Sequence, residues 1–216
     1  DHKRISDGDR GANTGGMGAY APAPVMTKEL DKIVYDTILL PAVKAMKKEG
    51  CPFKGCLYAG LMITKDGPKV VEFNCRFGDP ETEAVLPLLE SDLAKIMLAC
   101  TKGTLKKEKV EWKNACAVDV VLASEGYPAT HSSGEEIVGL EEAKKTGCLV
   151  FHAGSMKKNG RYFVNGGRVL NVVAVAPTLK EARDKAYEGV SKISWRGMQY
   201  RHDIADKGLK RLKKRK

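Results

Sequence analysis

The chain has 216 residues, of which 43% are hydrophobic and 30% charged, and its formal net charge is +10. This composition is typical of a globular protein with one or two buried cores. The longest apolar runs fall short of the about 18 residues that a membrane helix needs, and the polar start lacks the core of a signal peptide, so we expect a soluble, cytoplasmic protein.

Six cysteines are scattered through the chain and form no CxxC pair. A disulfide scaffold needs cysteines concentrated in a short secreted chain, and a zinc site needs paired spacing. We therefore expect reduced, mostly buried thiols in a cytosolic protein.

The excess positive charge is concentrated at the end of the chain. Seven of the 37 lysines and arginines lie in residues 207–216, so the remaining 30 nearly balance the 27 acidic residues. Such tails are usually solvated or serve as linkers, and only sometimes bind nucleic acid. Residues 204–216 are therefore interpreted as a basic tail or linker.

The first predicted element is a loop over residues 8–24, because glycine and proline recur throughout it. A helix is predicted from Thr27, which can act as its N-cap, to about Lys48, with apolar residues at helical spacing. Pro41 should kink or interrupt this helix because it lacks a backbone N–H.

A β-hairpin is predicted next, with strands at 56–63 and 69–74 around the turn KDGP. Both strands are mostly apolar on both faces, which is typical of a covered central sheet. Helices should follow at 82–89 and 91–102, the second with Ser91 as its N-cap.

After the polar stretch 103–114 the pattern becomes antiparallel α+β. The predicted elements are strands at 116–124, 148–154 and 168–176, a hairpin around Asn159–Gly160, and a helix from Thr178 to about Lys192. We therefore predict an α+β fold with two domains, residues 1–104 and 105–203.

The end of the second hairpin strand carries the clearest chemical signal. Side chains two residues apart on a strand share a face, so Glu72, Asn74 and Arg76 should point together while Cys75 packs on the other side. A carboxylate beside an amide oxygen suits Mg²⁺, and an arginine can stabilise a phosphoryl group in transfer. The alternative is a surface ion pair between Glu72 and Arg76.

The next turn, GDPE, adds Asp79 and Glu81. Two more carboxylates would repel a bare phosphate, but they could receive a cationic amine; the alternative is a helix-capping role. Metal, arginine and spare carboxylates together suggest coupling of an amine to a phosphate-activated acid.

Five sequence blocks resemble the glycinamide ribonucleotide synthetase (phosphoribosylamine–glycine ligase) family. They are EFNCRFGDPETEAVLPLLESDL, the start DHKR with NTGGMGAYAPAP, GYP at 126–128, VFHAG at 150–154 and GGRVL at 166–170. The blocks follow the family's order over about residues 1–203, and RFGDPETEAV is far more specific than an isolated ExN or GxG pattern.

The resemblance implies an ATP-grasp ligase that joins glycine to 5-phosphoribosylamine through glycyl phosphate, forming ADP and phosphate in purine biosynthesis. Its cofactors would be ATP and Mg²⁺, or Mn²⁺ in its place. Glu72 and Asn74 match the family's metal-binding pair, and Arg76 matches the arginine of its E-x-N-x-R pattern. Arg76, Asp79 and Glu81 are the catalytic candidates.

Weaker candidates for binding the nucleotide or substrate lie in two places. The glycine loop offers Asn13, Gly15 and Gly16, whose backbone can approach an anion closely, although a tight turn explains the glycines equally simply. Lys3 could pair with phosphate oxygens or could merely be solvated, and Arg168, which follows two glycines, could reach the ribose phosphate.

The resemblance also implies a missing part. The family's amino-terminal domain and lid subdomain precede the block at residues 1–24, so we expect this chain to be the carboxyl-terminal half and to be inactive alone. The missing domains are then its expected partners, and membranes and nucleic acid are not. The alternatives are another ATP-grasp carboxylate–amine ligase, a catalytically silent remnant, and a nucleic-acid-binding module that uses the basic tail.

Overall fold

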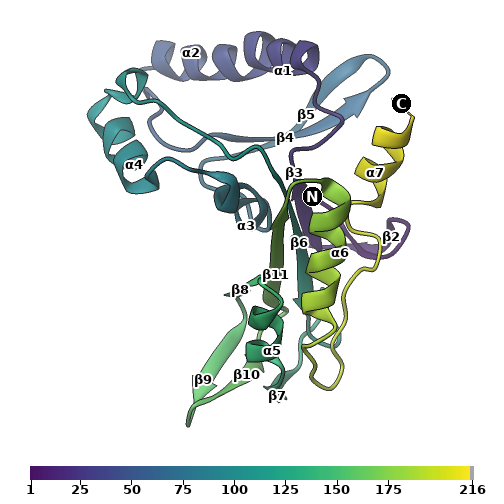
Figure 1. Ribbon diagram of the computed structural model, residues 1–216. Coiled ribbons are helices and arrows are strands. Elements are labelled where there is room, and N and C mark those ends of the chain that lie inside the picture. The colour runs from purple at the N-terminus through teal and green to yellow at the C-terminus, as the bar shows by residue number, and fades with distance from the viewer. Residues whose placement is uncertain (215–216) are drawn as a thin grey trace. The chain divides into compact units, whose positions relative to one another are not determined.

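The computed structural model describes residues 1–214, which divide into two compact units that interleave along the chain (Figure 1). The first unit contains residues 1–23, 79–88 and everything described from Lys113 onward, and the second contains 24–78 and 89–112. The predicted domains, residues 1–104 and 105–203, follow one another along the chain and do not coincide with these units. They stay a prediction. The predicted α+β class is confirmed, with antiparallel sheets throughout.

The core of the first unit is a four-stranded antiparallel sheet. Its strands lie in the order β3 (Gly18–Ala21), β6 (Cys116–Ala123), β11 (Arg168–Ala176) and β8 (Leu149–His152). The middle strands β6 and β11 are buried for most of their length, which explains their unbroken apolar sequences. The three strands predicted in this half of the chain are confirmed, although β8 is shorter than predicted.

Strand β3 was not predicted, because its sequence reads as a glycine-rich loop. It forms by pairing with β6, where Gly18 lies opposite Val120. Gly18 has φ +148°, and a Cβ there would lie 2.6 Å from the Asp119 carbonyl oxygen, so only glycine fits this close approach. Strands β1 (Arg4–Ser6) and β2 (Arg10–Asn13), also unpredicted, form a separate small hairpin.

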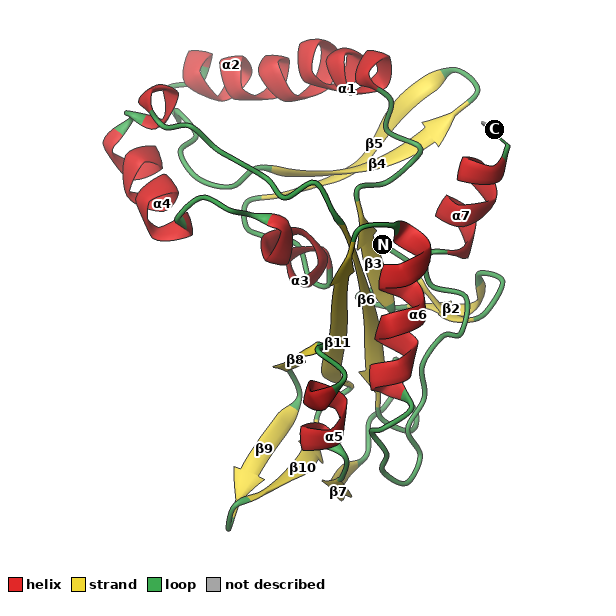
Figure 2. Cartoon of the chain, viewed as in Figure 1, coloured by secondary structure: helices red, strands yellow, loops and turns green. Residues whose placement is uncertain are grey.

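Helices pack on this sheet as Figure 2 shows. The longest, α6 (Leu179–Val190), confirms the predicted helix from Thr178 and begins with a capping box between Thr178 and Glu181. Its buried residues form one stripe that packs against β6 and β11. The short helix α3 (Glu81–Val85) packs against β3 and β6 and continues into a 3₁₀ turn at Leu86–Leu88.

A second, three-stranded sheet in this unit has the order β7 (Ser133–Ile137), β10 (Arg161–Asn165) and β9 (Ser155–Lys158). The turn between β9 and β10 has Asn159 and Gly160 at φ +49° and +79°, which confirms the predicted hairpin. Strand β7 and helix α5 (Leu140–Lys145) were not predicted.

The second unit begins with one long helical segment that changes its pitch in the middle. Helix α1 (Lys28–Val34) starts where Thr27 Oγ1 accepts the Leu30 N–H (3.1 Å), as predicted. A π-helical turn at Tyr35–Leu39 then leads into α2 (Leu40–Lys48). The predicted interruption near Pro41 is therefore a single π-helical turn. The helix continues past Pro41, which has no backbone N–H to donate.

The predicted hairpin and the following helix also lie in the second unit. Strands β4 (Tyr58–Thr64) and β5 (Gly67–Asn74) are confirmed, with a bulge after Gly60. Helix α4 (Leu93–Lys102) ends at Gly103, but its N-cap is Asp92 rather than Ser91. The Ser91 hydroxyl instead accepts the Glu111 N–H (2.7 Å), a contact that sequence spacing could not reveal.

The prediction that this hairpin lies in a covered central sheet is wrong for the described residues. Strands β4 and β5 form a two-stranded sheet, in which Met62 is 59%, Val71 66% and Phe73 44% exposed. Two strands with one long helical segment nearby have too little apolar partner surface to cover both faces. Exposed apolar side chains that are grouped in this way on a surface mark an interaction site.

The cysteine predictions are partly wrong. All six thiols are unpaired, but only Cys148 is buried, and Cys51 and Cys75 are exposed. Cys75 lies beyond the end of β5, so the strand alternation that predicted its packing no longer applies. Across residues 1–214, every helix is too short or too polar to cross a membrane.

Much of the predicted basic tail is helical. Helix α7 (Asp206–Lys213) buries Gly208, where a Cβ would lie 2.9 Å from side-chain atoms of both Leu179 and Tyr20. The glycine therefore allows α7 to lie close against the core of the first unit. The last two residues of the predicted tail, 215 and 216, lie outside the described residues.

One buried cation connects the start and the end of the first unit. Arg201 is 0% exposed and bonds Asp203 (2.7 Å), Asp9 (3.1 Å) and the Arg4 carbonyl (3.1 Å). Burial disfavours ionisation of Asp203, but the hydrogen bonds from Arg201 and the Gly8 N–H outweigh it and hold the pKa of this carboxyl well below its usual range. The network attaches the β1–β2 hairpin to the segment that precedes α7.

Arg201→Met should lower the free energy of unfolding by about 3 kcal/mol, because it removes a buried cation and leaves its partners, the half-buried Asp203 and the exposed Asp9, without it. Urea denaturation at pH 7 measures this, and Arg196→Ala, at an 87% exposed side chain, should change the value by less than about 0.5 kcal/mol. Since the pKa of Asp203 is lowered on folding, the difference should shrink as pH falls below about 4. Equal effects of both substitutions would contradict this role.

Candidate functional site

The end of β5 in the second unit carries the predicted metal-binding pair. Asn74 Nδ2 donates to Glu72 Oε1 at 3.2 Å, so these side chains lie together on one face of the strand. Gly60 lies opposite Glu72, and a Cβ there would lie 3.2 Å from Glu72 Cγ. A glycine at this cross-strand position therefore leaves room for the carboxylate.

Arg76 lies two residues beyond the end of β5, where the chain bends. Its Nη1 donates to the Phe77 carbonyl (2.8 Å) and its side chain is exposed. Because strand alternation ends at Asn74, it no longer determines the direction of this side chain. Convergence of Arg76 with Glu72 and Asn74 stays a prediction.

The chemistry of the pair fits a hard divalent cation. Glu72 supplies carboxylate oxygens, and rotation of the Asn74 amide would present its oxygen on the same side. In the described part of the chain no group of three or more histidine, cysteine or acidic residues could hold a metal. A cation bound to Glu72 and Asn74 would therefore take most of its ligands from water or phosphate, as Mg²⁺ commonly does.

A second group of predicted residues meets in the first unit, around Arg168. Its Nη1 lies 2.8 Å from Asp79 Oδ1 and also donates to the carbonyls of Asp79 (3.0 Å) and Gly16 (3.4 Å). A Cβ at Gly15 would lie 2.9 Å from the guanidinium. Four candidates far apart in sequence, Gly15, Gly16, Asp79 and Arg168, are thus brought together.

The glycine loop is held by side chains that the sequence did not single out. The Gly15 N–H donates to Tyr127 Oη and the Gly16 N–H to Thr14 Oγ1, both at 2.9 Å. Gly16 has φ +126°, and a Cβ would lie 2.3 Å from Pro80 Cδ. Both amides have protein acceptors, and the Arg168 guanidinium beside the loop is half-buried. The predicted anion contact from the amides stays a prediction.

The remaining candidates lie nearby or at the edge of the same unit. Lys3 pairs with Asp1 (2.5 Å) and lies 3.9 Å from Glu81 Oε1. Asn13 is exposed at the end of β2, opposite Arg4. Lys3 and Glu81 are therefore close enough for a weak ion pair.

Two acids near this group, the buried Asp119 and the half-buried Glu83, were missed by the sequence reasoning. Asp119 on β6 accepts from Asn171 Nδ2 (2.8 Å), but its other oxygen and Glu83 Oε2 on α3 are buried with no hydrogen-bond partner in the described structure. Burial raises the pKa of Asp119, and Glu83 and Asp79 raise it further. Burial also raises the pKa of Glu83. The one available signal was an aspartate inside the apolar run CAVDVVLA.

Glu83→Gln should make the stability of the chain less dependent on pH. Because the pKa of Glu83 is raised on folding, ionisation of this carboxyl lowers the free energy of unfolding as pH rises from the unfolded pKa, about 4.3, through the folded value. Glutamine cannot ionise and removes this effect. Urea denaturation between pH 4 and pH 8 should show the variant gaining relative to the parent chain as pH increases. The exposed control Glu142→Gln should leave the curve unchanged, and a parallel shift at all pH values for Glu83→Gln would contradict the prediction.

The chain matches two domain models of one family. Residues 1–82 match the phosphoribosylglycinamide synthetase ATP-grasp (A) domain, and residues 117–207 match the C domain of the same synthetase. Together these segments cover most of the chain. The chain belongs to the phosphoribosylglycinamide synthetase family. An ATP-grasp domain implies use of ATP.

Relatives of the synthetase family are similar over nearly the whole chain. A chloroplastic phosphoribosylamine–glycine ligase of Arabidopsis thaliana is 51% identical over 97% of this chain and 40% of its own length. The trifunctional purine biosynthetic protein adenosine-3 of Gallus gallus is 51% identical over 97% of this chain and 21% of its own. The crystal structure of a phosphoribosylamine–glycine ligase from Thermotoga maritima superposes with a TM-score of 0.80 at 41% identity, covering 94% of this chain and 50% of that one. The chain thus spans half or less of each of these proteins.

Proposed function

We propose that this chain is the carboxyl-terminal half of an ATP-dependent phosphoribosylamine–glycine ligase. The complete enzyme would join glycine to 5-phosphoribosylamine and form glycinamide ribonucleotide, ADP and phosphate. The observation that carries the proposal is the contact of Glu72 with Asn74 at a strand end, inside a chain of the synthetase family. Six unpaired cysteines are compatible with the reducing cytoplasm as its location.

The strand end of the second unit would serve the nucleotide. Glu72 and Asn74 would hold Mg²⁺, or Mn²⁺ in its place, and the cation would neutralise charge on the phosphates of ATP. Arg76 would stabilise the phosphoryl group that passes from ATP to the glycine carboxylate, because charge spreads over its equatorial oxygens during transfer. The exposure of Arg76 supports this role, since its guanidinium is accessible to a ligand.

The Arg168 group of the first unit would serve the amine substrate. Arg168 would bind the ribose phosphate, in which case the phosphate replaces Asp79 on the guanidinium. Asp79, once released, and Glu81 would then orient the amine, and one of them would accept the proton that nitrogen loses when it attacks the acyl phosphate. Lys3, beside Glu81, could contribute to anion binding.

The missing half of the enzyme would be the main partner of the chain. The curated relatives are at least twice as long as this chain, and the exposed apolar side chains of β4 and β5 need a cover. We therefore assign this surface to the amino-terminal and lid domains of the same enzyme. Strands added beside β4–β5 would complete the sheet.

Glu72→Gln in the complete enzyme should lower kcat by about 100-fold or more and raise the Mg²⁺ concentration needed for half-maximal rate, because the cation loses its charged ligand. ADP formation with glycine and phosphoribosylamine measures both effects. Arg76→Ala should lower kcat to a similar degree, whereas the exposed control Glu90→Gln should retain the parent rate.

The 216-residue chain alone should form no ADP above background in the same assay. Robust turnover by the chain alone, or unchanged kinetics in both Glu72→Gln and Arg76→Ala, would overturn the proposal.

Val71→Lys tests the proposed partner surface. In the complete enzyme it should lower the free energy of unfolding by about 2 kcal/mol, because the valine is then buried. In the 216-residue chain the same change should cost less than about 0.5 kcal/mol, because Val71 is 66% exposed. Leu149→Lys, at a 45% exposed position in the first unit, should affect both proteins equally. A similar cost of Val71→Lys in both would argue against a covered surface.

A further inference from the structure

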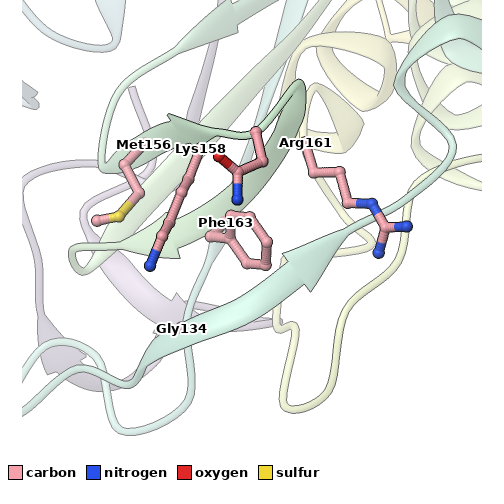
Figure 3. A pocket seen from close by; sticks show the side chains of 6 residues that line it. Gly134, Met156, Lys158, Arg161 and Phe163 are labelled. Atoms are coloured by element: carbon pink, nitrogen blue, oxygen red, sulfur yellow. The ribbon is translucent and has the colours of Figure 1, made fainter.

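The outer face of the three-stranded sheet carries an unusual set of side chains (Figure 3). Strands β9 and β10 pair so that Met156 lies opposite Phe163 and Lys158 opposite Arg161. Because side chains alternate along a strand, these four residues share one face. The other face carries the buried residues Val164 and Ile137, which pack into the core.

These side chains line an open cavity of about 580 Å³, together with Gly134 and Asn159. The solvent face of an antiparallel sheet is normally polar. Here its centre is apolar instead: Phe163 is half-buried and Met156 is 42% exposed. The core of the protein does not need this apolar pair, since the opposite face supplies the packing.

The charges around the cavity are mostly positive. Lys158 has no ion-pair partner in the described residues, and Arg161 pairs with Glu136 at 3.2 Å, both side chains being largely exposed. Lys157 points to the opposite face, where its Nζ lies 5.3 Å from the Tyr162 ring centroid. The cavity therefore offers one cation that is free to bind an anion and a second whose carboxylate partner an anion could displace.

The spacing of these groups suits one particular ligand chemistry. Each cation lies two residues along its strand from the apolar pair, a separation of about 6.6 Å. The Lys158 and Arg161 side chains extend to opposite sides of Phe163 (Figure 3), so a base on Phe163 and Met156 would have its phosphate near the unpaired Lys158 when one sugar lies between them. A single aromatic platform accommodates one base, whereas binding of a nucleic-acid strand uses several.

We propose that this cavity binds a nucleoside monophosphate, with its base against Phe163 and Met156 and its phosphate on Lys158. The volume lies within the range of small-molecule sites, roughly 300–1,000 Å³. The Asn159 side chain at the turn would provide hydrogen bonds to the base or the ribose. The cavity uses none of the residues assigned to ATP or to the amine substrate, so it constitutes a separate site.

Titration of the 216-residue chain with AMP, followed by calorimetry, tests the proposal. Binding with a dissociation constant of about 1 mM or tighter is expected, and Phe163→Ser and Lys158→Gln should each weaken it by about tenfold. The matched control Lys157→Gln, on the opposite face of the same strand, should leave the affinity unchanged. Circular dichroism would check that each variant keeps its fold.

Adenosine and ribose 5-phosphate separate the two halves of the ligand. Each should bind more weakly than AMP, because adenosine engages only the apolar pair and ribose 5-phosphate engages only Lys158. No detectable AMP binding at 5 mM would overturn the proposal, as would AMP affinity unchanged in both Phe163→Ser and Lys158→Gln. These outcomes are independent of ligase activity, which the proposal does not require.

Discussion

The antiparallel pairing of β6 with β11 is the interaction on which the first unit depends. Both strands are buried for most of their length, and β3 pairs with the outer edge of β6. This arrangement brings the glycine loop, which precedes β3, to the start of β11, where Arg168 lies. Helix α3 packs against β3 and β6 and supplies the turn that carries Asp79. The residues around Arg168 meet because the glycine loop and the turn before α3 both assemble on one strand pair.

Glycines and a buried arginine hold the segments of the first unit close together. Gly15, Gly16 and Gly18 each stand where a Cβ would collide with a neighbouring group, so the loop can adopt its close approach only without side chains there. Ion pairs of Arg201 with Asp9 and Asp203 attach the β1–β2 hairpin to the segment before α7. Removing the buried arginine would destabilise this attachment. The unpartnered oxygens of Asp119 and Glu83 lie below the Arg168 group and favour protonated carboxyls in the folded state.

The second unit is organised differently, because much of its apolar surface is exposed among the described residues. Its two-stranded sheet exposes large apolar side chains on β4 and β5, yet the same hairpin positions Glu72 beside Asn74 at the strand end. The strand end therefore forms locally, although the apolar side chains around it are exposed.

The sequence by itself determined the elements whose signals are local, and it predicted the family. Alternating or continuous apolar runs located β4, β5, β6 and β11, a capping residue located the start of α1, and the Asn159–Gly160 pair located a hairpin. Two-residue periodicity also predicted the contact between Glu72 and Asn74. These features depend on backbone geometry that neighbouring residues impose.

Only the tertiary structure decided the rest. Strand β3 forms in a glycine-rich segment because β6 offers a partner, and α7 forms in a basic tail because Gly208 can lie against the core. The ion pair between Arg168 and Asp79, the hold of Tyr127 on the glycine loop and the burial of Asp119 all join residues far apart in sequence. Contacts between residues far apart in sequence leave no local periodicity that could predict them. Exposure depends on which surfaces meet, and for that reason the predicted burial of β5 and of most cysteines was wrong.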